Sequence, residues 1–368
     1  TTVLPLATAG SAALLPPYLA AGSDERAAAQ AAALAQPHRY PLLGSIVEQS
    51  AHKLVAERVL DHHHDLFLQD HAIGGTPSRL QRGLLPLTVV PFTFSMEMIA
   101  EAAALLAGGT LRVVGFANLR GSRWLALDGA TLHVRIVAEH AGDDPGRINA
   151  RIFALDQDKA VGVFEGTVLL AMQYPAAPAP RPWQSSEALP PRVNPDGELY
   201  AHGMFHGPRL QGVQRLRRGG ERSIEAEIAA LPTGHYFDFT PAPQFECDAA
   251  QLDAIGSVAA YWVTEREGWV ASCFPFRVAH CSLYAPPAPA GTRTLCRADV
   301  RDSGDGTIAA DFDILGNDGR VLATLDGWED RKFAAPARFA DFRLDPPQKF
   351  LSEPLLDGVL AQGLIARR

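Results

Sequence analysis

Two side chains that lie far apart in the sequence could act as a base and an acid. His71 lies in DHAIGG (Asp70–Gly75), where an apolar stretch gives way to two glycines. Its imidazole can exchange a proton near neutral pH, and the glycines would let the backbone approach a ligand closely. A histidine beside a turn is also a common structural residue, so this motif alone does not define a site.

The acid is Asp253, in the apolar segment QLDAIG. A carboxyl group there lies near a helix start, at an exposed edge or in the core, and burial would raise its pKa. A buried carboxyl that stays un-ionised can donate a proton at neutral pH, and we expect this state for Asp253. Asp248 lies nearer the expected helix start and fits the role of N-cap.

Two other motifs contain several polar groups. In FHGPRLQG (Phe205–Gly212), Gly207 and Pro208 fix a sharp turn beside His206. DHHHD (Asp61–Asp65) could suggest a metal site, but consecutive side chains point in different directions and rarely share one ion, so we expect a polar turn and no metal. The segments GDGT and GNDG are turn sequences, and no dinucleotide or phosphate-binding fingerprint occurs.

The elements that must position these side chains follow the same plan in both halves of the chain. A helical segment (Ser95–Gly109, then Phe245–Val263) is followed each time by strand-like segments separated by turns. The pattern predicts an α+β fold, a double hotdog in which each antiparallel sheet wraps around one helix, with a site at the junction. The expected regions are an Ala/Pro-rich linker with a short helix after Ser23 (1–37), an N-terminal hotdog (38–173), a Pro-rich inter-hotdog linker (174–196), a C-terminal hotdog (197–340) and a C-terminal linker (341–368).

The composition narrows the class of protein and its partners. Of the 368 residues, 47% are hydrophobic and 20% charged, as in ordinary soluble domains. The net charge is -8 and lysine and arginine form no long run, which argues against nucleic acid. The densest basic run, Gln214–Arg222, fits a solvated strand edge, with a patch for an acidic carrier protein as the alternative. The four cysteines form no CxxC pair, so we expect reduced thiols in a cytoplasmic protein. No apolar run is long enough for a membrane helix, so we expect no membrane contact.

Five motifs in order resemble the dehydratase domain of a type I polyketide synthase or polyunsaturated fatty acid synthase. YPLLGS is similar to the family's HPLLG, and DHAIGG to the start of HxxxGxxxxP. VPFTFSMEMIAEAA is similar to the stretch from the proline of that motif, Pro91, into the central helix. FHGPRLQG is similar to YGPxFQ, and LDAIGSVAAYW to LDxxxQ. The likeness runs from about residue 38 to about residue 340.

The resemblance implies a carbon–oxygen lyase that dehydrates a 3-hydroxyacyl thioester to the 2-enoyl thioester during polyketide or fatty acid chain extension. His71 would take the C2 proton and Asp253 would protonate the C3 hydroxyl. The substrate would be carried on the phosphopantetheine of an acyl carrier protein, with no other cofactor, and the other domains of a megasynthase would be partners, with a homodimer left open. The linker-like N-terminus favours a place inside such a synthase. The residues expected to contact the substrate are Gly75, Pro91, His206, Gly207, Pro208 and Ser257.

Three departures from the family pattern leave alternatives open. Fifteen residues rather than four separate Gly75 from Pro91, an insertion that could form a lid or a contact surface. His206 replaces the usual tyrosine, with Leu210 in place of phenylalanine, and Ser257 replaces the glutamine or histidine that orients the aspartate. A non-catalytic docking or dimerisation module is therefore one alternative. A cyclase or isomerase that uses the same cleft is another.

Overall fold

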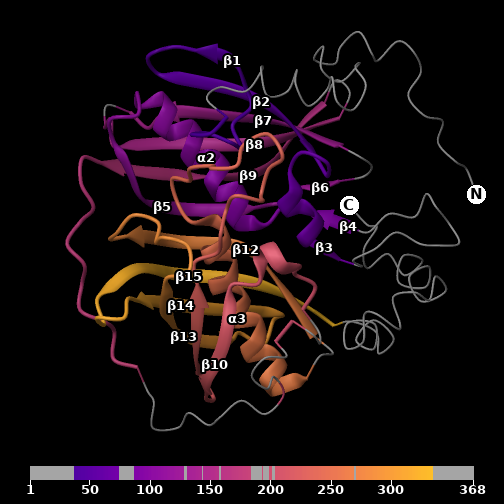
Figure 1. Ribbon diagram of the computed structural model, residues 1–368, viewed down its shortest axis with the longest axis vertical. Helices are drawn as coiled ribbons and strands as arrows, with labels where there is room; N and C mark the ends of the chain where they lie inside the picture. The colour runs from indigo at the N-terminus through magenta and orange to yellow at the C-terminus, as the bar shows by residue number, and fades with distance from the viewer. Residues whose placement is uncertain are drawn as a thin grey trace, which may run out of the picture.

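The computed structural model describes residues 37–73, 87–127, 131–142, 144–156, 159–183, 193, 199–200, 204–268 and 271–334. Two similar units lie one above the other in Figure 1, and the element order repeats between them. The first unit contains β1 (Ser45–Gln49), β2 (Lys53–Asp61), η3 (Leu66–Asp70), β3 (Ala72–Ile73), β4 (Leu87–Val89), α2 (Phe92–Leu106), β5 (Arg112–Gly121), β6 (Ala126–Leu127), β7 (Thr131–His140), β8 (Arg147–Asp156) and β9 (Lys159–Ala171). The second contains η4 (Pro208–Leu210), β10 (Val213–Gly219), β11 (Ser223–Ala229), α3 (Ala249–Glu267), β12 (Ala271–Leu283), β13 (Arg293–Asp302), β14 (Thr307–Leu315) and β15 (Val321–Ala334).

One twelve-stranded sheet runs through both units in the order β1-β2-β7-β8-β9-β5-β12-β15-β14-β13-β11-β10. β5 of the first unit pairs antiparallel with β12 of the second, so the two half-sheets are continuous at the centre of the molecule (Figure 1). Every pair of neighbouring strands in this sheet is antiparallel. Each half-sheet packs against one helix, α2 or α3, and the expected double hotdog fold is therefore confirmed.

Both central helices form from sequences rich in alanine and larger apolar residues, which favour helix. Pro91 stands at the N-cap of α2, where its missing N–H costs nothing, and Gly108 and Gly109 follow the helix with φ of 73° and 68°. The side chain of Asp248 accepts a hydrogen bond from the Gln251 N–H at 2.9 Å and caps α3, as expected. Most residues of both helices are buried, which places them in the core between the sheet and the junction of the units.

A glutamate on α2 connects the two units. Glu97 is fully buried, and its two carboxylate oxygens accept the backbone N–H groups of Glu246 at 2.5 Å and Cys247 at 2.7 Å. Those two residues lead directly into α3. Because buried polar groups are held to their partners by the cost of leaving them unsatisfied, the start of α3 is fixed relative to α2.

The described part of the Pro-rich stretch, up to residue 183, runs from β9 along the side of the second unit (Figure 1). Arg181 anchors it there. Its Nε donates to Asp313 at 2.6 Å, and its other guanidinium nitrogens reach Asp326 and the Phe312 carbonyl, each at 2.6 Å. The short helix expected before residue 37 and the tail after residue 340 lie outside the described residues.

Three other expectations concern the surface and the thiols. β10, which carries the basic run, is a terminal strand of the sheet, as the solvated-edge interpretation requires. The four cysteines are free thiols. Among the described helices, none combines the length and the hydropathy needed to span a bilayer.

Candidate active site

His71 comes from the first unit, at the end of the short helix η3, and it is buried with 7% of its surface exposed. Its Nδ1 lies 2.6 Å from the carbonyl oxygen of Val89. Since a carbonyl can only accept, Nδ1 must carry the proton, and neutral His71 therefore has its lone pair on Nε2. Burial lowers the pKa of this imidazole to about 4, because water no longer stabilises the charged form; His206 adds to the shift and Asp253 opposes it. The ring is thus a neutral base at pH 7.

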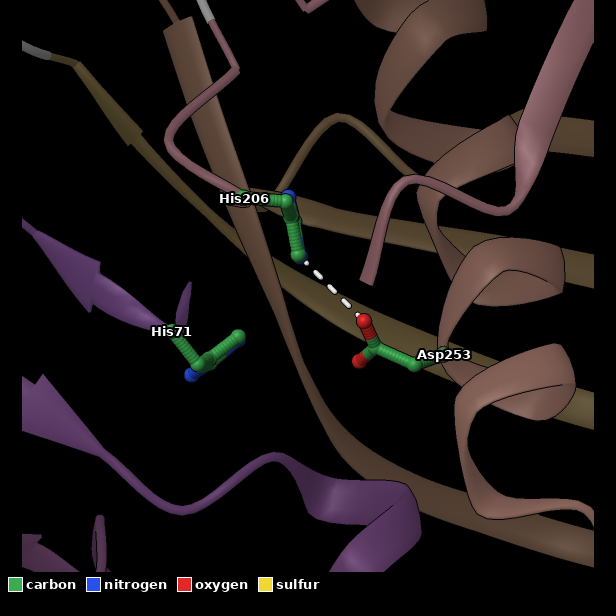
Figure 2. Close-up of side chains that lie close together, drawn as sticks. All are labelled: His71, His206 and Asp253. Carbon is green, nitrogen blue, oxygen red and sulfur yellow. Dashed lines mark ion pairs between the residues drawn. The ribbon is translucent and has the colours of Figure 1, made fainter. Parts of the chain in front are cut away.

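Asp253 comes from the second unit, on the second turn of α3, and faces His71 across the junction (Figure 2). Its side chain is 12% exposed. Burial acts to raise the pKa of the carboxyl, but the imidazoles of His206 and His71 lower it more, and the result lies below the usual value. The expectation of an un-ionised Asp253 is therefore wrong for the free site: the helix around it is apolar, as the sequence indicated, but two histidines face it.

His206 lies on the segment before η4 and is the third member of the cluster. Its Nε2 lies 3.2 Å from Oδ2 of Asp253, the ion pair drawn in Figure 2. The backbones of His71 and His206 form an isolated antiparallel bridge, and their ring centroids are 5.2 Å apart. One donor atom from each of His71, His206 and Asp253 lies within 4.8 Å of the others. Two units that are separate in sequence thus contribute to one site.

Asp70, next to His71, joins the two units at this point. Its backbone carbonyl accepts the Gly207 N–H at 2.8 Å, and its Oδ2 accepts the backbone N–H of Arg209 at 2.7 Å and its guanidinium Nη1 at 3.2 Å. A Cβ on Gly207 would overlap the Asp70 carboxylate. The turn therefore needs glycine because of this close approach, and the contact sets the separation between His71 and His206.

The remaining residues expected to bind substrate have different positions. Pro208 is the first residue of η4, directly after Gly207. Ser257 lies one turn after Asp253, and its Oγ donates to the Asp253 backbone carbonyl at 3.1 Å rather than to the carboxylate. Pro91 precedes α2, and its contact with substrate stays a prediction. Gly75 and the insertion up to residue 86 lie outside the described residues.

The sequence predicted that His206 contacts the substrate, but it did not reveal the contact between His206 and Asp253. The combination of a short Ser257 on α3 and a histidine in the neighbouring turn was the available signal. It also missed Asp70 and Glu97, which hold the two units together, because hydrogen bonds to backbone groups of a distant segment leave no spacing pattern. The DHHHD motif is a turn after β2, in which His64 pairs with Asp238 at 2.7 Å.

Within the part of the chain that the structure describes, one group of three histidine, cysteine or acidic side chains is close enough to hold a metal ion, and it is this same cluster of His71, His206 and Asp253. Two imidazoles and a carboxylate would suit a divalent transition metal. They also supply a neutral imidazole base and a carboxylate, which are groups that serve in general acid–base catalysis.

Comparison with known proteins gives the same architecture. Residues 176–340 match a family model described as "Polyketide synthase dehydratase N-terminal domain". The dehydratase domain of the CurF module of the curacin polyketide synthase aligns with a TM-score of 0.60 at 17% identity, covering 81% of this chain and 100% of that one. A trans-AT polyketide synthase dehydratase domain from Brevibacillus brevis aligns with a TM-score of 0.58 at 16% identity, covering 81% and 100%. A dehydratase structure from work on the borrelidin and fluvirucin polyketide synthases aligns with a TM-score of 0.55 at 21% identity, covering 82% of this chain and 95% of that one. No curated protein matches.

The fold and the cluster at the junction define a double hotdog domain with ionisable residues contributed by both units. The match to the polyketide synthase dehydratase family model extends over residues 176–340, which is less than half of the chain. The solved structures, at these low identities, establish the shared fold.

Proposed function

We propose that this domain dehydrates a 3-hydroxyacyl thioester, carried on the phosphopantetheine of an acyl carrier protein, to the 2-enoyl thioester during polyketide chain extension. One observation carries the proposal. A neutral imidazole from the first unit and a carboxylate from the second have donor atoms within 4.8 Å of one another, in a group that also contains His206. A docking module would have no need for this arrangement, because it would require neither a base nor an acid.

His71 is the base in this proposal. Its Nδ1–H is held by the Val89 carbonyl, which fixes the ring and leaves Nε2 to accept the C2 proton. The lowered pKa keeps the ring unprotonated at neutral pH. The C2 proton is acidified by the thioester carbonyl, and a neutral, oriented base then removes it at a rate that a free histidine in water does not reach.

Asp253 is the group that faces the C3 hydroxyl. As the C3–O bond breaks, its electron pair stays on the oxygen, which must receive a proton to leave as water. Negative charge develops on the thioester oxygen at the same time, and N–H groups at the start of α2 would stabilise it. The C2 proton taken by His71 is the proton that the oxygen needs; it passes through the Asp253 carboxylate to the departing oxygen, so that the site ends the reaction as it began.

The reaction needs no cofactor beyond the phosphopantetheine arm of the substrate. The partners that follow from it are an acyl carrier protein, which delivers the thioester, and the neighbouring domains of a synthase. The family match over residues 176–340 supports this assignment.

Mass spectrometry of 3-hydroxyacyl thioesters after incubation with the domain tests the proposal. Substrates bound to a carrier protein and their N-acetylcysteamine analogues should both lose one water, and His71→Ala should lower the rate about 10²- to 10⁴-fold, the range for general acid–base groups. A product of unchanged mass would indicate isomerisation or cyclisation in the same cleft. Absence of any conversion across a panel of chain lengths would favour the docking module.

A further inference from the structure

Three aromatic rings lead from the candidate active site toward the surface of the molecule. Phe205 is the inner ring: its centroid lies 4.9 Å from that of His71, and it stacks on His206 at 4.5 Å. Phe274 follows, with its centroid 6.1 Å from that of Phe205. Trp124 is the outer ring, 5.0 Å from Phe274. These spacings are those of aromatic contacts, so Phe205, Phe274 and Trp124 form one continuous series, here called the aromatic strip.

The aromatic strip is built from both units. Phe205 precedes η4 and Phe274 lies on β12, both in the second unit, whereas Trp124 follows β5 in the first. β5 and β12 are the strands that pair where the two half-sheets meet. The rings therefore cross the same junction of the units that contains the candidate active site.

Exposure separates the rings of the strip from those of the core. Phe67 and Phe94, which stack on each other in the core, are 0% exposed. Phe205 and Phe274 are only partly buried, and Trp124 is 38% exposed. A single exposed apolar side chain is common, but a connected apolar surface is typical of a binding site. Because none of the three rings titrates, the strip can bind a ligand but cannot transfer its protons.

The proposed function, on which this inference rests, requires one part of the substrate to reach the surface. The reacting carbon has to lie at His71, which is 7% exposed. The carrier protein is too large to enter such a site and stays outside, so the pantetheine arm must span the distance between them. The acyl chain, on the other side of the thioester, has no such requirement. A series of rings that begins at His71 and ends at an exposed tryptophan therefore fits the arm.

The chemistry of the arm suits aromatic rings as well. Pantetheine contains a quaternary carbon with two methyl groups, several methylene groups and two amides, and it carries no charge along its length. Methyl and methylene groups pack on ring faces, and an aromatic side chain supplies a large contact area at low cost in conformational entropy. We propose that the aromatic strip binds the pantetheine arm of the thioester substrate and so holds the C2 carbon at His71. Trp124 contacts the part of the arm nearest the carrier protein, and Phe205 contacts the thioester end.

Two thioesters of the same 3-hydroxyacyl group test this proposal. One is the pantetheine thioester, and the other is the N-acetylcysteamine thioester, which keeps only the sulfur end of the arm. In Trp124→Ala and in Phe274→Ala, kcat/KM should fall about 10-fold further for the pantetheine thioester than for the N-acetylcysteamine thioester, as expected for loss of one aromatic contact. A loss that is equal for the two substrates overturns the proposal, because the ring would then act on the acyl chain or on the fold. Unchanged values for both substrates overturn it too.

Phe153→Ala is the matched control. Phe153 is also a partly buried phenylalanine, and its ring lies 5.9 Å from the Arg151 guanidinium. It follows Ile152 on β8, which is 0% exposed, and alternation along the strand turns Phe153 away from the core. The ratio of the two kcat/KM values should equal that of the wild type in this variant. A change in the ratio as large as that in Trp124→Ala overturns the proposal, because the effect would not be specific to the aromatic strip.

A binding measurement without turnover separates this proposal from the function itself. The domain is labelled with fluorotryptophan, and the ¹⁹F resonance of Trp124 is assigned with Trp124→Phe. Addition of S-methyl pantetheine, which has no acyl group to react, should shift this resonance, and S-methyl N-acetylcysteamine at the same concentration should shift it much less. A resonance that does not respond to S-methyl pantetheine, or that responds equally to both compounds, overturns the role of the strip, whether or not a thioester is converted. A wild type in which Trp124 responds as expected but no thioester is converted counts against the proposed function alone.

Discussion

The base should stay active well below the pH at which an ordinary histidine becomes protonated. Burial lowers the pKa of His71 to about 4. A group whose folded pKa is depressed in this way binds a proton only when the pH falls to that value. The acidic limb of kcat/KM, which reports the free enzyme, should therefore lie near pH 4 rather than near 6.5.

The size of the effect follows from the fraction of neutral imidazole. With a pKa of about 4, most of His71 is neutral at pH 5.5, so the rate there should stay close to the rate at pH 7. An unperturbed histidine would be about 9% neutral at pH 5.5, and the rate would drop about eightfold between the two pH values. The ionisation of Asp253 does not obscure the result, because its lowered pKa keeps the carboxyl charged across this interval.

The assay is kcat/KM from pH 5 to 8 with a 3-hydroxyacyl N-acetylcysteamine thioester, which has no ionisable group in this range. Far-UV circular dichroism and the thermal midpoint at each pH establish that the protein stays folded. An eightfold fall between pH 7 and pH 5.5 in a folded protein would refute the assignment of His71 as a buried neutral base.

Two further predictions concern buried contacts. One lies between the two units and the other lies within the first unit. Gly207→Ala should lower the free energy of unfolding by about 1–3 kcal/mol and reduce activity, because the new methyl group would overlap the Asp70 carboxylate. The control is Gly219→Ala, where an added Cβ meets nothing within 4 Å. Equal thermal midpoints for the two variants would contradict this prediction. Asp65→Asn should lower the free energy of unfolding, measured with urea, by about 3–5 kcal/mol. The reason is that Arg58 would lose its buried counter-charge: it is 1% exposed and lies 2.5 Å from Asp65. A loss below about 1 kcal/mol would contradict this prediction.

Much of the fold could be predicted from local signals. Both central helices have the composition of buried helices, and Pro91, Asp248 and the glycines after α2 mark their ends by backbone rules that operate within a few residues. The strands are bounded by glycine and aspartate turns. Two repeats of helix followed by strands leave few arrangements other than two sheets that wrap two helices.

The electrostatics of the site could not be predicted in the same way. The sequence around Asp253 is apolar, and from it alone a raised pKa was the natural inference. The sign of the shift depends on His71 and His206, which reach the carboxyl only after the two units pair. The connections through Asp70 and Glu97 are equally invisible in sequence, because their partners are backbone N–H groups of the other unit.

The central claim is that His71 and Asp253 act together, from different units, on one reaction. The most direct test compares kcat/KM for loss of water in His71→Ala, Asp253→Asn and the double variant. Both single variants should lose at least about 10²-fold, and the double variant should be no slower than the slower single variant by more than a few fold, since groups that act as one unit are not additive. A single variant that keeps the wild-type rate, or a double variant whose loss is the product of the two single losses, would contradict the account.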